Sequence, residues 1–196
     1  GHVPTLEEMH KLSDEELVEL QLSKSNWHAQ RARIILQYRA SKKALTSGSI
    51  SRLNELLVNN KNEDTRLRAL WTLQITNNLP EKRLIALLED KDQYIRAWAV
   101  QFLVEDGQPS PRATQMLTAL AKKEHSPVVR RYLAGALQRI DEGNRWEIAE
   151  SLVQFKEDAR NPNIPLMLWF GIEPLVAKQP EKALALANES EIPSIV

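Results

Sequence analysis

The sequence contains no cysteine, which excludes disulfide bonds, thiolate metal sites, thiol nucleophiles and covalent haem attachment within this chain. It also has no net charge, because 26 basic and 26 acidic side chains cancel. Proteins that bind a phosphate backbone usually carry a basic excess, so nucleic acid is not the expected partner. No apolar run approaches the roughly 18 residues of a membrane-spanning helix, so we expect no membrane contact from this segment.

Catalytic and ligand-binding motifs are also missing. With only 6 glycines, the chain has no Gly-rich phosphate loop, and it has neither a nucleophile elbow nor the residue order of a catalytic triad. None of the four histidines has a second histidine four residues away, the spacing that places two imidazoles on one helix face. We therefore predict a protein that is not an enzyme, with no cofactor, metal or small-molecule ligand.

What the sequence does contain is an internal repeat. When the chain is aligned with itself, four arginines and one proline take the same place, with a period of roughly 30 to 35 residues. These residues are Arg31, Arg66, Arg96, Arg130 and Pro165. No segment has the alternating pattern of a strand.

Apolar residues follow each of these positions at plus three, plus four and plus seven, which is one stripe of an α-helix. The stripes are Ile34, Ile35 and Tyr38; Ala69, Leu70 and Leu73; Ala99, Val100 and Leu103; Leu133, Ala134 and Leu137; Leu168, Trp169 and Ile172. A second set of amphipathic segments lies between them, at residues 14–22, 51–58, 81–88, 112–121, 146–155 and 181–187. Alternating helices of this kind predict stacked helical hairpins.

Helix start signals agree with this division. Ser13 with Glu16 forms a capping-box pattern, and Ser126 precedes a proline suited to the first helical position. The prediction is an all-α superhelix: a lead-in at residues 1–12, with Gly1 interpreted as a tag remnant, and one repeat domain at 13–196. That domain would hold about five and a half hairpins, because residues 192–196 end where the partner of helix 181–187 would begin.

Residues 87–90, LLED, followed by Arg96, resemble the HEAT repeat pattern, and Glu124 with Arg130 repeats the spacing. Arg66 and Arg31 follow in weaker copies. The resemblance implies a structural ladder in which loop acids such as Asp90 and Glu124 meet helix-start arginines, since one guanidinium can bridge several oxygens.

A narrower resemblance covers almost the whole chain. Residues 94–101, the pair Arg145 and Trp146, and above all residues 163–175 resemble the HEAT region of bacterial membrane-bound-dehydrogenase-like proteins of the Planctomycetes and Bacteroidetes type. In that family the region follows a sugar-dehydrogenase-type β-propeller and precedes a c-type cytochrome domain. The resemblance implies an extracytoplasmic, multidomain parent in which this segment is a spacer. It transfers no catalytic residue.

Two functions stay open. The first is a scaffold that binds other domains of the parent chain or another protein. Trp98, Tyr132 and Met167, each interpreted as lying two residues beyond its repeat position, could form its partner surface or could be buried between repeats. The second is a nucleic-acid-handling repeat protein, which a concave row of Arg33, Arg68 and Arg131 would favour.

Overall fold

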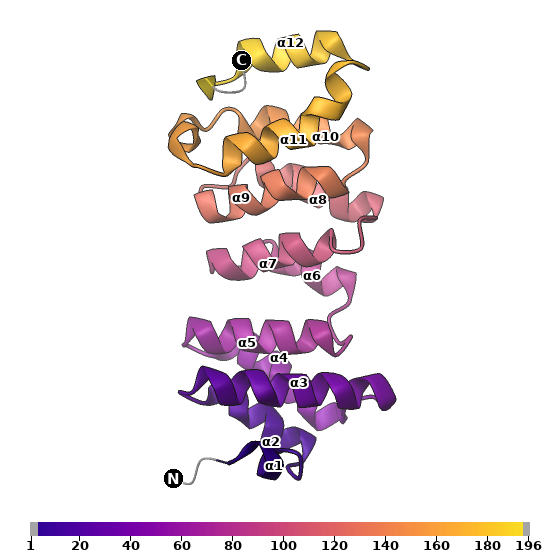
Figure 1. The fold of residues 1–196 in the computed structure, drawn as a ribbon, viewed down its shortest axis with the longest axis vertical. Helices are drawn as coiled ribbons and strands as arrows, with labels where there is room; N and C mark the ends of the chain where they lie inside the picture. The colour runs from indigo at the N-terminus through magenta and orange to yellow at the C-terminus, as the bar shows by residue number, and fades with distance from the viewer. Residues whose placement is uncertain (1–3, 194–196) are drawn as a thin grey trace. The chain divides into compact units, whose positions relative to one another are not determined.

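The structure is a computed structural model that describes residues 4–193, and the regular structure in that range is entirely helical (Figure 1). Helix makes up 73% of it, in twelve α-helices and three short 3-10 segments among the described residues. The prediction of an all-α helical repeat is confirmed. The chain divides into two compact units, unit 1 at Gly1–Pro80 and unit 2 at Glu81–Val196.

Unit 1 contains a short first helix and two hairpins. Its helices are α1 (Leu6–Met9), α2 (Asp14–Glu19) continued by η1 (Leu20–Leu22), α3 (Asn26–Lys42), α4 (Ser47–Asn59) and α5 (Glu63–Ile75). Helix α2 packs against α3, and α4 packs against α5, so consecutive helices form hairpins. The first helices α2 and α4 also contact each other, as do the second helices α3 and α5.

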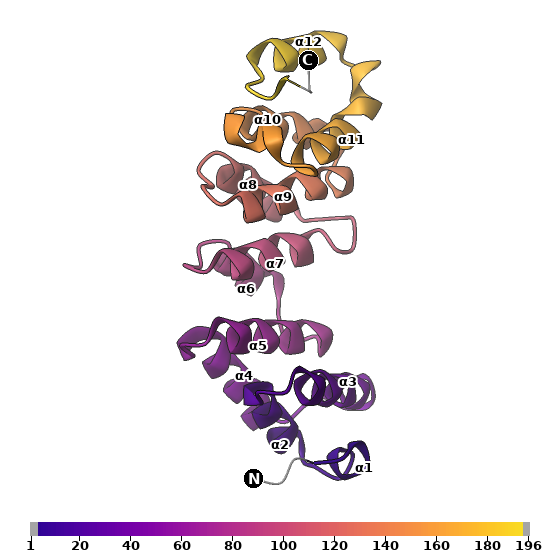
Figure 2. The ribbon, with the colours of Figure 1, turned by 60° about the vertical axis from the view of Figure 1, so that its left-hand side comes forward.

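Unit 2 repeats this arrangement. Its helices are α6 (Glu81–Leu87), α7 (Gln93–Leu103), α8 (Pro111–Ala121), α9 (Pro127–Ala136) continued by η2 (Leu137–Arg139), α10 (Glu142–Leu152), η3 (Lys156–Arg160), α11 (Ile164–Val176) and α12 (Pro180–Glu189). The second helices α7, α9 and α11 pack side by side, and the first helices α6, α8, α10 and α12 form the other layer (Figures 1 and 2).

Side-chain caps explain where many helices begin. A serine, threonine, asparagine or aspartate oxygen accepts an otherwise unpaired backbone N–H at the start of eight α-helices. These caps are Thr5, Ser13, Ser25, Thr46, Asn62, Asp92, Ser110 and Ser126. The predicted capping box of Ser13 and Glu16 is present, and Pro127 follows the Ser126 cap as predicted. The segment predicted as a lead-in contains α1, which has a capping box of its own from Thr5 and Glu8.

The predicted stripes are buried in α5, α7 and α9 but are misplaced in α3. Of that stripe only Ile35 is buried as predicted. Ile34 and Tyr38 are 46% and 66% exposed, and Ala32 and Leu36 are buried in their place. The reason is the position of the cap: the ladder arginine lies four residues after the N-cap in α5, α7 and α9, and in α3 that position holds Ala29. Aligning the first repeat on Arg31 therefore shifted it by about half a helical turn. In α11, Leu168 and Ile172 are buried as predicted, but Trp169 is 40% exposed.

Close packing against α11 depends on Gly171. A Cβ at this position would lie 2.6 Å from the Cβ of Leu137 and 2.8 Å from its Cδ1. Pro174 lies in the same helix, where it cannot donate the backbone hydrogen bond that another residue would. The guanidinium of Arg145 donates to the carbonyl oxygen of Gly171 at 3.0 Å, which ties α10 to this irregular part of α11.

We expect Gly171→Ala to lower the free energy of unfolding by about 1–3 kcal/mol, because the new methyl group overlaps Leu137. Gly135→Ala in α9 is the matched control, since its nearest neighbour, the Met167 sulfur, would lie at 3.7 Å. That control should gain about 0.5–1 kcal/mol from the better helix propensity of alanine. Denaturant unfolding followed by circular dichroism measures both. Equal stability of the two variants would contradict the tight contact.

Candidate functional site

Arg130 is the most deeply buried charged residue of the predicted ladder, with a side chain that is 1% exposed. Its Nε and Nη2 donate to the two carboxylate oxygens of Asp158 at 2.6 and 2.8 Å, and Nη2 also reaches Glu157 at 3.2 Å. Nη1 donates to the carbonyl oxygens of Glu124 and His125 in the preceding loop. A buried guanidinium needs this degree of pairing, because an unpaired charge in the interior is costly.

Arg96 makes the equivalent contacts one repeat earlier. Nε and Nη2 donate to the Glu124 carboxylate at 2.9 and 2.8 Å, while Nη1 donates to the carbonyl oxygens of Asp90 and Lys91. Burial acts to raise the pKa of the Glu124 carboxyl, but hydrogen bonds from Arg96 and from the backbone N–H of Ser126 outweigh it. The pKa of Glu124 is therefore lowered from its ordinary value.

In both pairs the arginine meets an acid 28 residues further along the chain, in the loop of the next hairpin. Glu124 was predicted from the sequence and Asp158 was not, although the common separation of 28 residues is a signal that could have identified it. Asp158 lies in η3, which begins just after the helical segment predicted at residues 146–155 and for which no structure was predicted.

The remaining predicted ladder arginines, Arg66 and Arg31, differ from each other in burial. Arg66 is 3% exposed, and its Nε donates to the carbonyl oxygen of Leu57 at 2.7 Å. Arg31 is exposed, and its guanidinium lies over the ring of Trp27 at 5.7 Å, so its inclusion in the ladder is corrected: Ala29 occupies the ladder position of α3. Pro165 supplies no donor, as expected.

The predicted partner surface lies on the second helices of unit 2. Trp98 and Tyr132 are half-buried neighbours with ring centroids 6.0 Å apart, and Phe102, which the sequence analysis missed, lies 5.3 Å from Trp98. Met167 is also half-buried, against Gly135. We call Trp98, Phe102 and Tyr132 the aromatic cluster. The structure thus brings residues from α7 and α9 together at a surface that is neither fully buried nor fully exposed.

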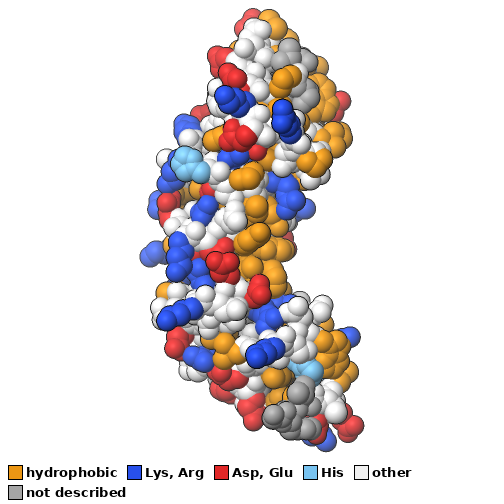
Figure 3. Space-filling view, turned by 90° about the vertical axis from the view of Figure 1, so that its left-hand side faces the viewer, with side chains coloured by type: hydrophobic (Ala, Val, Ile, Leu, Met, Phe, Trp, Pro, Cys, Tyr) orange, Lys and Arg blue, Asp and Glu red, His pale blue; other side chains and the backbone are white. Residues whose placement is uncertain are grey.

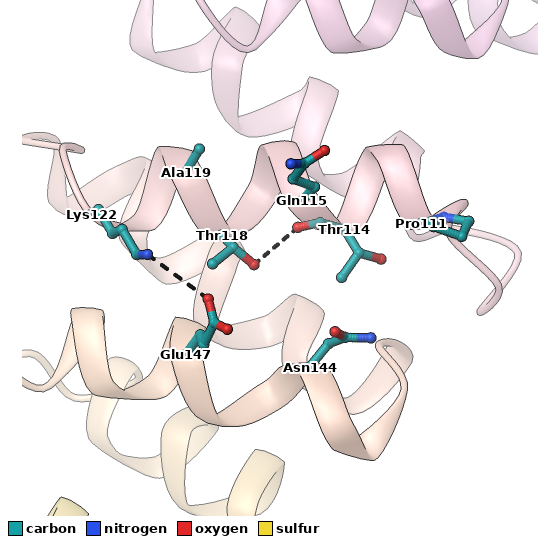
Figure 4. Close-up of a pocket in the computed structure, with 8 residues that line it drawn as sticks. All are labelled: Pro111, Thr114, Gln115, Thr118, Ala119, Lys122, Asn144 and Glu147. Atoms are coloured by element: carbon teal, nitrogen blue, oxygen red, sulfur yellow. Dashed lines mark hydrogen bonds and ion pairs between the residues drawn. The ribbon is translucent and has the colours of Figure 1, made fainter.

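A cavity of about 500 Å³ lies between α8 and α10 of unit 2 (Figure 4). Lys122 and Glu147 face each other across it at 3.8 Å, and both side chains are more than half exposed. Thr118 donates its hydroxyl hydrogen to the carbonyl oxygen of Thr114 at 3.0 Å. A hydroxyl that is bonded to its own helix and an exposed ion pair do not form a nucleophile and base within hydrogen-bond reach.

Other ligand chemistry gains no support from residues 4–193. No group of three or more metal-ligating side chains is present among them, and none of their helices is long and apolar enough to cross a membrane. In Figure 3, the upper part of the view, which belongs to unit 2, has acidic and basic side chains interspersed, and hydrophobic side chains gather along its right-hand border.

The sequence was compared with models of known protein families and with curated proteins. Residues 50–138 match the family model for HEAT repeats. This part of the chain is a HEAT-repeat region. A comparison with curated proteins gave no match. HEAT repeats are typical of helical scaffolds and interaction modules. This agrees with the contacts of Arg96 and Arg130, which bind acids in neighbouring loops of the fold.

We expect Arg130→Ala to lower the free energy of unfolding by about 3–5 kcal/mol, because Asp158 would keep a buried charge without its partner. Arg31→Ala, at an exposed position, should have a free energy of unfolding within about 0.5 kcal/mol of that of the unsubstituted chain. Adding Asp158→Ala to Arg130→Ala should recover part of the loss, and denaturant unfolding of the set measures the coupling. An Arg130→Ala variant as stable as Arg31→Ala would disprove the structural role.

The lowered pKa of Glu124 predicts acid sensitivity. The group binds protons less readily in the folded chain, so its contribution to stability is complete above its ordinary value of 4.5 and disappears as pH falls through the lower folded pKa. We expect Glu124→Gln to lower stability at neutral pH and to flatten the decline below about pH 4.5. Arg96→Met should flatten it similarly. Unfolding curves between pH 3 and 7 measure these slopes, and unchanged slopes in both variants would contradict the assignment.

Proposed function

We propose that this chain is a non-catalytic HEAT-like scaffold whose aromatic cluster docks a protein surface. The observation that supports it most is the division of roles in unit 2. The guanidinium groups of Arg96 and Arg130 donate hydrogen bonds to loop oxygens. Trp98 and Tyr132, in contrast, are half-exposed on adjacent helices. Aromatic side chains with one buried and one accessible side are typical anchors of protein interfaces.

The proposed partner is another domain of the same polypeptide or a second protein, with the chain serving as a spacer in a larger extracytoplasmic redox protein. This finer role rests on the resemblance of residues 163–175 to membrane-bound-dehydrogenase-like proteins. In the structure these residues belong almost entirely to α11, whose Leu166 and Phe170 are 52% and 47% exposed. Exposed apolar residues on a helix of the same layer would extend the docking surface beyond the aromatic cluster.

Nucleic acid is the weaker alternative. Of the three arginines that would favour it, Arg68 donates to the carbonyl oxygens of Gln21 and Ser23, and Arg131 lies over the ring of Tyr132 at 5.6 Å. A phosphate-binding surface needs several cations that are free to contact successive phosphates.

The test uses isothermal titration calorimetry between this chain and the segments that adjoin it in its natural polypeptide. We expect Trp98→Ala with Tyr132→Ala to weaken binding by about 2 kcal/mol or more, as loss of an interface anchor does. Leu184→Ala, at a residue of α12 that is 64% exposed, is the control for loss of apolar surface elsewhere. Thermal unfolding of each variant verifies that the fold is retained.

Equal affinity of the double variant and the Leu184→Ala control would reject the aromatic cluster as the docking surface. If no adjoining segment bound the chain, the spacer role would be rejected as well.

A further inference from the structure

A second cavity, of about 280 Å³, lies in unit 1 between α3 and α5. Arg33 and Asn26 line it from α3, and Asp64, Arg68 and Trp71 line it from α5. We call it the Arg33 pocket. It is separate from the aromatic cluster, whose residues all belong to unit 2.

The Arg33 guanidinium is partly buried, and its Nη1 has no acceptor among the described residues. Its Nη1 atom is inaccessible to solvent, and within residues 4–193 no oxygen accepts a hydrogen bond from it. Its planar group lies over the ring of Trp71, 5.1 Å from the centroid, which provides cation–π attraction but no hydrogen bond. Burial first, and then the nearby charge of Arg68, lower the pKa of Arg33. A charged group in this state favours an anion that can reach it.

The acidic side chains of unit 1 are mostly occupied elsewhere. Asp14 pairs with Arg39 at 2.8 Å, and Arg52 binds both Glu19 and Glu55. Further acids accept hydrogen bonds at helix starts: Glu8 and Glu16 in capping boxes, and Glu15 from Thr46. Asp64 lines the pocket but forms no ion pair with a described residue.

Arg68 makes the pocket rigid before any ligand arrives. Its Nη1 donates to the carbonyl oxygens of Gln21 and Ser23 at 3.0 and 2.7 Å, and its Nη2 donates to the Asn26 side chain. These bonds fix the second positive charge beside Arg33.

We propose that the Arg33 pocket binds a carboxylate side chain from an acidic segment of a protein partner. The proposal rests on the proposed function as a protein-binding scaffold and adds a second contact site to it. Because Nη1 is inaccessible to solvent, the carboxylate would be bound through Nε and Nη2, from which the planar guanidinium can donate two parallel hydrogen bonds, and the volume suits a single side chain. A nucleic-acid strand fits less well, because Arg33 is one cation and Asp64 places a negative charge in the same pocket.

The experiment titrates the complete chain with the peptide acetyl-Gly-Gly-Glu-Gly-Gly-amide while following the side-chain N–H signals of Arg33 and Trp71 by NMR. We expect saturable shifts at these two residues. The same peptide with glutamine in place of glutamate should bind at least about tenfold more weakly, because it loses a charge-assisted pair.

Four substitutions test the assignment of the site. Arg33→Gln should abolish the shift of Trp71, whereas Arg31→Gln, on the exposed side of the same helix, should leave it unchanged. Asp64→Asn should tighten binding of the glutamate peptide, because it removes a competing negative charge. Arg33→Met should unfold at the same temperature as the unsubstituted chain or higher, since it removes a partly buried charge whose Nη1 has no acceptor among the described residues.

A lack of shifts with the glutamate peptide, or equal shifts with the glutamine peptide, would overturn the proposal. So would a melting temperature lowered by more than about 5 °C in Arg33→Met, which would mark the guanidinium as structural. Stronger shifts with a ten-nucleotide single strand than with the peptide would replace it with nucleic-acid binding. Each of these results leaves the test of Trp98 and Tyr132 independent, because those residues lie in unit 2.

Discussion

The fold depends on the need of each short amphipathic helix to cover its apolar stripe. A helix of seven to seventeen residues, such as those between α3 and α11, has little stability alone in water and gains it by packing. Leu36, Leu57 and Leu70 in unit 1, and Ile95 and Leu133 in unit 2, are almost completely buried as a result. Burial at about 25 cal/mol per Å² of apolar surface makes the helix pairs stack into two layers within each unit.

Stacking has an electrostatic consequence at the loops that precede the second helices. Successive hairpins bring these loops close together, where backbone carbonyl groups would otherwise lack donors. Arg96 and Arg130 satisfy several of these carbonyls and bind an acid of the next loop, Glu124 or Asp158. The arginines that define the repeat in sequence therefore have their hydrogen-bond donors occupied by loop oxygens of the fold itself. The proposed docking therefore uses other side chains, those of the half-exposed aromatic cluster.

Arg33 and Arg130 show how one residue type can have opposite roles. Arg130 is buried with a full set of acceptors, so removing it should damage the fold. Arg33 is partly buried with none among the described residues, so it adds little to stability and is prepared to bind an anion. Local departures from full pairing of this kind are typical of binding sites, where stability is given up for recognition.

The sequence by itself determined the helical class, the repeat and the capped starts of α2 and α9, because helix periodicity and capping are local properties. It also identified Arg66, Arg96 and Arg130, whose buried contacts follow a fixed spacing after each N-cap. Only the tertiary structure showed that Arg31 lies on the exposed side of α3, that Asp158 completes the Arg130 site, and that Nη1 of Arg33 has no acceptor within residues 4–193. Those outcomes depend on which side chains from different helices come within about 3 Å of one another, and a one-dimensional pattern does not specify such distances.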